Sequence, residues 1–327
     1  MSTSKGIVIN PRSLSRRPSG HHTQIKKTLA LTSMVLPGSI WLLFIRYLPM
    51  LGITLAFKDY RMNPRANNFI SNFFYSEWVG FEKFKFLFTN DSWTMIRNTL
   101  AYNTVFIVLG IVIAVTFAIM LSEITQRFAA KTYQTLMFFP YFLSWIVASY
   151  FVMAFLDPTS GLLTFWQKSM GMKPIDFYQD PTYWPLILVI SNLWKNIGYS
   201  TVLYLAAITG IDATQYEAAA VDGATKWQQI RHVTLPGIKT MIIILFIMNV
   251  GKIFNADFGL FYNVPQNSGM LYPVTQVIDT YVYNSYQKTK DVGMSSAAGL
   301  FQSVIGFVCI IGANAIVRRF DAESSLF

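Results

Sequence analysis

A short, mostly polar segment between two long apolar runs reads Glu217-Ala218-Ala219-Ala220-Val221-Asp222-Gly223 and continues through Ala224 to Leu235-Pro236. Asp212 and Gln215 precede it at the spacing of a helix start signal, and the three alanines favour a helix. Glycine tolerates left-handed backbone angles, so Asp222-Gly223 should end that helix. A second helical run, Thr225 to His232, should follow. The segment therefore predicts an elbow of two short helices on a membrane surface.

The composition of the chain is that of a membrane protein. Hydrophobic residues make up 53% of the 327 residues and charged residues 13%, which argues against soluble domains. Long apolar runs with few acids indicate helical spans of roughly 20 residues each. The sequence therefore predicts an all-α integral membrane protein. Its six transmembrane helices are expected at about residues 28–57, 93–121, 133–156, 183–208, 237–261 and 297–317.

Lysine and arginine set the expected orientation in the membrane. Residues 1–25 are basic and polar and should form a disordered cytoplasmic tail, ahead of a membrane domain at 26–327. Basic residues outnumber acids in the segments expected inside, whereas the outer loops balance. Both termini, and Glu217 with them, should therefore be cytoplasmic. The formal charge of +10 is thus a topology signal and predicts no nucleic-acid binding.

The sequence carries no motif for chemistry of its own. It has no G-x-x-x-x-G-K-[ST] phosphate loop, no G-x-S-x-G elbow and no H-E-x-x-H segment. Its one cysteine, Cys309, lies in an apolar run, and the three histidines lie outside the predicted spans. We therefore expect no enzyme activity, no metal site and no cofactor in this chain.

Polar residues within the predicted spans are candidates for a transport path. Such groups are costly in lipid, so they should face the bundle interior, a cavity or one another. Asn196, Asn255 and Gln302 are the better candidates for lining a route for neutral, hydroxyl-rich cargo, although packed amides also join membrane helices. Lys252 should pair with an acid or a carbonyl on another helix. Asp257, near the outer end of the fifth span, is expected to be solvated there rather than to contact cargo.

The elbow segment has a further regularity in its spacing. Gly223 follows the second alanine of Glu217-Ala218-Ala219 by four residues, and Val233 and Leu235-Pro236 complete the pattern. This resembles the EAA motif of the membrane subunits of ATP-binding-cassette (ABC) importers, with Val233 where isoleucine is usual. The resemblance implies cytoplasmic coupling helices at about 212–235, seated in a groove of an ATPase. The implied coupling residues are Glu217, Ala218, Ala219, Asp222, Gly223, Ala224, Leu235 and Pro236.

Other segments resemble one branch of these importers, the LplB-type polysaccharide permeases of carbohydrate transport. They include Pro49-Met50-Leu51-Gly52-Ile53, Trp78-Val79-Gly80, Asp257-Phe258-Gly259-Leu260-Phe261-Tyr262 and Ile278-Asp279-Thr280-Tyr281-Val282-Tyr283. The resemblance implies a type I ABC importer permease (MetI-like) fold over a transmembrane permease domain at 26–327, in a bacterial inner membrane. It also implies a second homologous permease subunit, two ATPase subunits that bind ATP and Mg, an extracytoplasmic solute-binding protein and an oligosaccharide cargo. None of these segments is a sugar-contact motif, so no cargo-binding residue is carried over.

Two other functions remain open at this point. An ABC importer of non-sugar cargo such as peptides would share the elbow but lack a segment like Ile278–Tyr283. An ion-coupled secondary carrier would need acids within the membrane, and only Asp257 comes close.

Overall fold

The computed structural model describes residues 21–60, 69–89, 92–322 and 325–326. Residues 1–20 of the expected tail therefore lie outside the described residues, and residues 21–25 belong to the first helix. The chain divides into two units, residues 1–53 and 54–327.

The described part of the first unit is one interrupted helix. It consists of α1 (His21–Leu42), the π-helical turn η2 (Leu43–Tyr47), α2 (Leu48–Met50) and the first residues of the 3-10 helix η3 (Leu51–Phe57), which continues into the second unit. Pro37 lies inside α1 and Pro49 inside α2. The stretch Leu31–Phe57 is long and apolar enough to cross a membrane, as expected for the first span.

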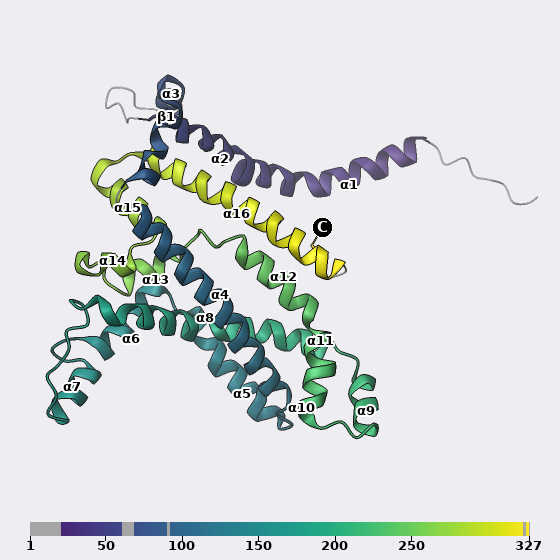
Figure 1. The fold of residues 1–327 in the computed structure, drawn as a ribbon. Coiled ribbons are helices and arrows are strands. Elements are labelled where there is room, and N and C mark those ends of the chain that lie inside the picture. Colours follow the sequence, from purple (N-terminus) through teal and green to yellow (C-terminus); the bar gives the residue numbers. More distant parts are fainter. Residues whose placement is uncertain (1–20, 61–68, 90–91, 323–324, 327) are drawn as a thin grey trace, which may run out of the picture. The chain divides into compact units, whose positions relative to one another are not determined.

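In its described residues the second unit is helical apart from one two-stranded sheet (Figure 1). Its elements are β1 (Lys58–Asp59), α3 (Phe69–Tyr75), β2 (Glu77–Trp78), η4 (Gly80–Phe88), α4 (Ser92–Ser122), α5 (Arg127–Phe138), η5 (Phe139–Phe142), α6 (Trp145–Leu156), α7 (Leu162–Ser169), η6 (Pro181–Tyr183), α8 (Trp184–Thr209), α9 (Ala213–Val221), α10 (Lys226–Gln229), η7 (Ile230–Thr234), α11 (Leu235–Gly237), α12 (Lys239–Val250), α13 (Phe258–Asn263), η8 (Gly269–Leu271), α14 (Tyr272–Thr275), α15 (Ile278–Thr289) and α16 (Val292–Phe320). Helices α9, α10 and α11 lie at one end of α8 and α12, and α13 to α15 lie toward the other (Figure 1).

An ionic cluster ties this two-stranded sheet to the start of α16. β1 pairs antiparallel with β2, with Lys58 opposite Trp78. The Lys83 Nζ donates to Asp59 Oδ1 at 2.7 Å and to Asp291 Oδ2 at 2.8 Å. Partial burial lowers the pKa of Lys83, but the hydrogen bonds to the two carboxylates outweigh it and hold that pKa above its ordinary value.

The centre of the second unit is the packing of α4 against α8. Small side chains on α4, Ala114 and Ala118, are fully buried beside Tyr204 of α8. Small residues at such a contact let the two helix backbones approach closely. On the other side of α8, a Cβ on Gly198 would collide with the backbone of Met137. Helix α8 is therefore held on two faces, by α4 and by the end of α5.

The six predicted spans correspond only in part to continuous helices. In the described residues, Leu31–Phe57, Ser92–Ser122 and Val292–Arg319 are long and apolar enough to span, and two bent helix pairs raise the number to at most five. Helix α8, expected as the fourth span, is a 26-residue helix but is not among these five. Its polar residues, Asn192, Lys195 and Asn196, lower its hydropathy.

Two predicted spans are wrong as single helices. The third is broken: Trp145–Leu156 is bent by 103° from Arg127–Phe142, because Pro140 lies in the 3-10 turn Phe139–Phe142 and Leu143 is extended. The fifth ends at Val250, eleven residues before its expected end at Phe261, and α13 begins only at Phe258.

Candidate functional site

The first limb of the elbow, residues 212–235, is the helix α9. Its N-cap is Asp212, whose carboxylate accepts a hydrogen bond from the Thr214 N–H at 3.0 Å. Hydrogen bonds from the backbone and side chain of Thr214 lower the pKa of Asp212. The helix ends at Val221, and Gly223 follows with φ +77°, in the left-handed region that glycine adopts without strain. The predicted helix start and break are both confirmed.

The second limb begins with a capping box that the sequence reading missed. The Thr225 N–H donates to Gln228 Oε1 at 2.7 Å, and the Gln228 N–H to Thr225 Oγ1 at 3.4 Å. The limb is α10, the π-helical turn η7 and α11 in succession, so the predicted run to His232 continues to Gly237. The signal was present in the sequence as Thr-x-x-Gln.

Side-chain contacts tie the two limbs to each other and to α4. The Tyr216 hydroxyl and Thr234 Oγ1 are 2.9 Å apart, which joins α9 to η7. The Lys226 ammonium lies 2.9 Å from the Glu123 carboxylate, just beyond α4. The elbow is thus connected in sequence to α8 and α12 and by an ion pair to the end of α4.

Most of the predicted coupling residues are accessible. Glu217, Ala218, Asp222, Gly223 and Pro236 are exposed, and Ala219, Ala224 and Leu235 are half-buried. Two further apolar side chains are conspicuous on this polar segment, namely Val221, 88% exposed, and Trp227, 69% exposed. Exposed apolar groups of this kind mark contact surfaces.

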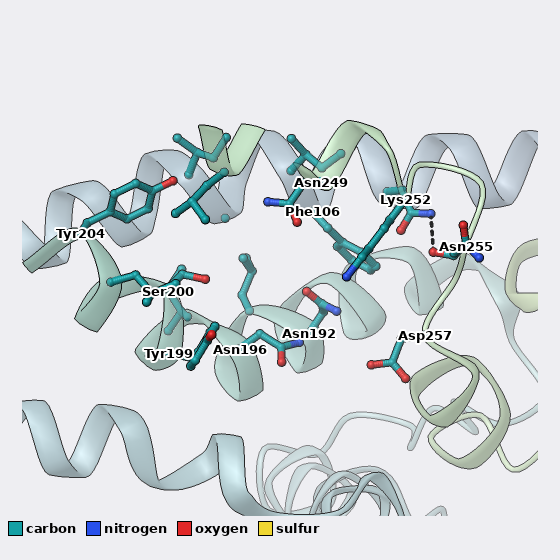
Figure 2. Close-up of a pocket in the computed structure, with 18 residues that line it drawn as sticks. Phe106, Asn192, Asn196, Tyr199, Ser200, Tyr204, Asn249, Lys252, Asn255 and Asp257 are labelled. Carbon is teal, nitrogen blue, oxygen red and sulfur yellow. Dashed lines mark hydrogen bonds between the residues drawn. The ribbon is translucent and has the colours of Figure 1, made fainter. Parts of the chain in front are cut away.

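A cavity of about 450 Å³, lined by both apolar and polar side chains, lies between α4, α8, α12 and the segment after α12 (Figure 2). The lining positions on α8 include Asn192, Asn196 and Ser200, which are four residues apart and share one helix face. Helix α4 contributes Asn103 and α12 contributes Asn249, among other residues. The spacing of the α8 residues was visible in the sequence, but only the structure shows which helices face it.

The unwound segment between α12 and α13 forms one wall of this cavity. Asn103 Nδ2 donates to the carbonyls of Ile253 at 2.7 Å and Asn255 at 3.1 Å. Gln302 Nε2 donates to the Phe254 carbonyl at 2.8 Å, and Asp279 Oδ2 accepts the Ala256 N–H at 2.8 Å. Non-helical backbone at membrane depth is tolerated where its polar groups are paired in this way.

Asp257 lies at the end of the unwound segment and is held by a tryptophan. The Trp145 Nε1–H donates to Asp257 Oδ2 at 2.6 Å, and Asp257 Oδ1 caps α13 by accepting from the N–H groups of Gly259 and Leu260. A Cβ on Gly259 would collide with the Trp145 ring. The buried Lys195 lies beside this pair, with its Nζ 5.4 Å from the Trp145 ring centroid and 2.9 Å from the Tyr141 carbonyl oxygen. Asp257 is exposed, as expected, but it faces the cavity.

Several other polar side chains that line the cavity make no hydrogen bond or ion pair within the described residues. Within the described residues, the side-chain amides of Asn192, Asn196, Asn249 and Asn255 and the ammonium of Lys252 have no hydrogen-bond or ion-pair partner. The expectation that Lys252 pairs with an acid or a carbonyl on another helix is therefore wrong for this part of the chain. In Figure 2 the extended Lys252 side chain points into the cavity.

The structure brings two of the three predicted path residues together. Asn196 and Asn255 line the cavity described above. Gln302 lies elsewhere: it is buried, its amide is used on Phe254 and Asp279, and it borders a second cavity of about 370 Å³ beside Tyr283. Among the residues that the structure describes, no three His, Cys, Asp or Glu side chains are grouped to hold a metal ion.

Two broken spans, a cavity with several amides between α4, α8 and α12, and a polar elbow at one end define a helical membrane transport protein. The chain belongs to the family described as binding-protein-dependent transport system inner membrane component, which matches residues 86–322.

Relatives and a solved structure agree with this family. The chain is 33% identical over 300 residues to Protein LplB of Bacillus subtilis (strain 168), which covers 91% of this chain and 92% of the relative. It is 31% identical over 291 residues to the polygalacturonan/rhamnogalacturonan transport system permease protein YteP of the same organism, covering 89% and 88%. A crystal structure of a bacterial alginate ABC transporter, in complex with an alginate pentasaccharide-bound periplasmic protein, contains a similar chain. It has a TM-score of 0.79 and 31% identity, over 91% of this chain and 97% of that one. The expected ABC permease fold is thereby confirmed.

Proposed function

We propose that this chain is the permease subunit of an ATP-driven importer that receives oligosaccharides or polysaccharide fragments from an extracytoplasmic solute-binding protein. The observation that carries the cargo class is the cavity, where four uncommitted amides and the rings of Tyr199 and Tyr204 surround about 450 Å³. Each amide offers two donors and an acceptor, which suits neighbouring hydroxyl groups. The names of YteP and of the alginate transporter support the same class.

The elbow is proposed to be the contact with the ATPase. Glu217, Ala218, Asp222 and Gly223 are exposed together, and Val221 and Trp227 add apolar surface beside them. Closure of an ATPase pair would move the elbow as a rigid body, and the motion would pass to the helices that flank it. In this proposal ATP and Mg bind to two ATPase subunits, and a second homologous permease completes the path.

The proposed topology places both termini and the elbow on the cytoplasmic side of a bacterial inner membrane. Six spans are reached when each bent pair counts as one span and α8 as the sixth. The half-buried polar face of α8, which lines the cavity, supports this assignment, because it would be shielded from lipid inside the assembled transporter.

Purification and reconstitution test the proposal. The tagged chain, purified gently from its native membrane, should bring a second permease and an ATPase with it. In vesicles, the complex should hydrolyse ATP faster when its binding protein is loaded with an oligosaccharide. Stimulation by peptides and not by sugars would contradict the cargo class, and ion-driven uptake without ATP would contradict the whole proposal.

The substitution Glu217→Lys tests the coupling role directly. It reverses an exposed charge on α9 without touching a predicted span, so insertion should be normal. We expect weaker ATPase binding and a loss of cargo-stimulated hydrolysis. The matched control is Glu77→Lys in β2, another exposed glutamate, which should leave both measurements unchanged.

A further inference from the structure

The two charged groups in the 450 Å³ cavity differ in how far neighbouring groups compensate their charge. Of the described residues that line it, Lys252 and Asp257 carry charge. If both charged groups were equally free to bind a ligand, the cavity would have no preference for ligand charge. Their hydrogen bonds show that the two groups are not equally free.

The carboxylate of Asp257 is already compensated. It accepts hydrogen bonds from Trp145 Nε1 at 2.6 Å and from the N–H groups of Gly259 at 3.0 Å and Leu260 at 3.4 Å. Lys195 also interacts with it electrostatically. Three donors and a nearby ammonium use most of the acceptor capacity and offset the negative charge.

The ammonium of Lys252 has no such compensation. No acid or carbonyl within the described residues pairs with it. Its backbone is nonetheless fixed, because the Lys252 carbonyl accepts the Asn255 N–H at 2.8 Å in the turn after α12. An unpaired ammonium on this anchored backbone, in a cavity between membrane helices, favours an anionic partner, since an unpaired charge within a membrane bundle is costly.

We propose that Lys252 selects cargo by binding a carboxylate, so that the transported oligosaccharide carries acidic sugar residues. This refinement rests on the function proposed above and replaces the expectation of a neutral cargo. The uncommitted amides of Asn192, Asn196, Asn249 and Asn255 then bind hydroxyl groups around the carboxylate. Lys252 is thus a specificity-determining residue with a role distinct from that of the amides.

The experiment compares charged and neutral forms of one sugar. The complete transporter, in vesicles with its binding protein, is supplied with short oligogalacturonates and oligomannuronates and with their carboxyl-reduced neutral counterparts. Uptake and stimulated ATP hydrolysis are measured for the wild type, Lys252→Gln, Lys252→Arg and Lys252→Glu. Lys288→Gln is the matched control, because it removes an exposed lysine from α15, outside the cavity.

We expect the wild type to prefer an acidic form. Lys252→Gln should reduce the transport of that form about tenfold, as expected for loss of a charge-assisted hydrogen bond, and leave the neutral form nearly unchanged. Lys252→Arg should retain the preference, Lys252→Glu should invert it, and Lys288→Gln should behave as wild type.

Other outcomes overturn the proposal in distinguishable ways. Equal losses for both forms, or a wild type that transports only neutral sugars, would refute the role of Lys252 and leave the sugar importer intact. Loss of subunit assembly in Lys252→Gln would show that Lys252 pairs with an acid of a partner subunit. A wild type that transports no oligosaccharide, acidic or neutral, would refute the proposed function itself.

Discussion

In the elbow, backbone angle and exposure indicate what single residues contribute. Gly223 has φ +77°, and no atom lies near the place a side chain would occupy. Glycine is therefore needed here for its backbone angle and not for lack of space. The sequence predicted this break from Asp-Gly alone. It did not single out Val221 or Trp227, because apolar residues are common throughout a membrane protein and only the structure shows that these two are exposed.

The substitution Gly223→Val should uncouple the protein without unfolding it. A β-branched residue at this φ costs about 1–2 kcal/mol locally, which should shift the bend between α9 and α10. Cargo-stimulated ATP hydrolysis should fall at least severalfold while membrane insertion stays normal. Gly171→Val is the matched control, since Gly171 has φ +71° and an equally open surrounding but lies outside the elbow. Equal effects of the two substitutions would contradict the prediction.

The substitution Trp227→Ser should weaken ATPase binding. Trp227 is 69% exposed on α10, and burial of an aromatic side chain is a common source of interface affinity. The loss of affinity should be about tenfold or more, measured by titrating the ATPase onto the purified permease pair. Trp166→Ser on α7, where the tryptophan is 51% exposed, should have no effect on this binding. A Trp227→Ser variant with unchanged affinity would show that α10 is not in the contact.

Among the elements, continuous apolar helices were predictable and broken ones were not. The span expected at 93–121 is α4, Ser92–Ser122, and the one at 297–317 lies within α16. The third and fifth spans failed because hydropathy does not report backbone angles. Their breaks depend on Pro140 and on Asn103, Gln302 and Asp279, which pair the unwound backbone from distant parts of the sequence.

The unwound segment should depend on Asn103 for its stability. The substitution Asn103→Leu leaves the carbonyls of Ile253 and Asn255 without their amide donor. Unpaired polar groups of this kind cost about 1–3 kcal/mol, so the thermal unfolding temperature of the purified complex should drop by several degrees. Asn192→Leu is the matched change on the opposite wall. Because the Asn192 amide has no partner in the described chain, Asn192→Leu should reduce transport with little loss of stability. A larger loss of thermal stability in Asn192→Leu than in Asn103→Leu would refute this assignment.

At the scale of the whole molecule, the distribution of basic residues predicts which side of the membrane each end occupies. Cysteines introduced as Ser4→Cys and Ser285→Cys, in a Cys309→Ala background, should respond oppositely to an impermeant thiol reagent in intact cells. Ser4 lies outside the described residues, whereas Ser285 is on α15. We expect labelling at Ser285→Cys only, and labelling at Ser4→Cys only would invert the topology.

Gly251, just after α12, lies against Gly306 of α16, and this close contact would act as a pivot for α12. A Cβ on either glycine would collide, with Ile310 at Gly251 and with the Gly251 carbonyl at Gly306, so the far end of α12 rests directly on α16. From this point to Lys239 the helix is about 18 Å long. A tilt of about 10° around the pivot would therefore swing the elbow end through roughly 3 Å. Lys252, beside the pivot, would hardly move, so a tilt would change the width of the cavity toward the elbow while its charged end kept its geometry.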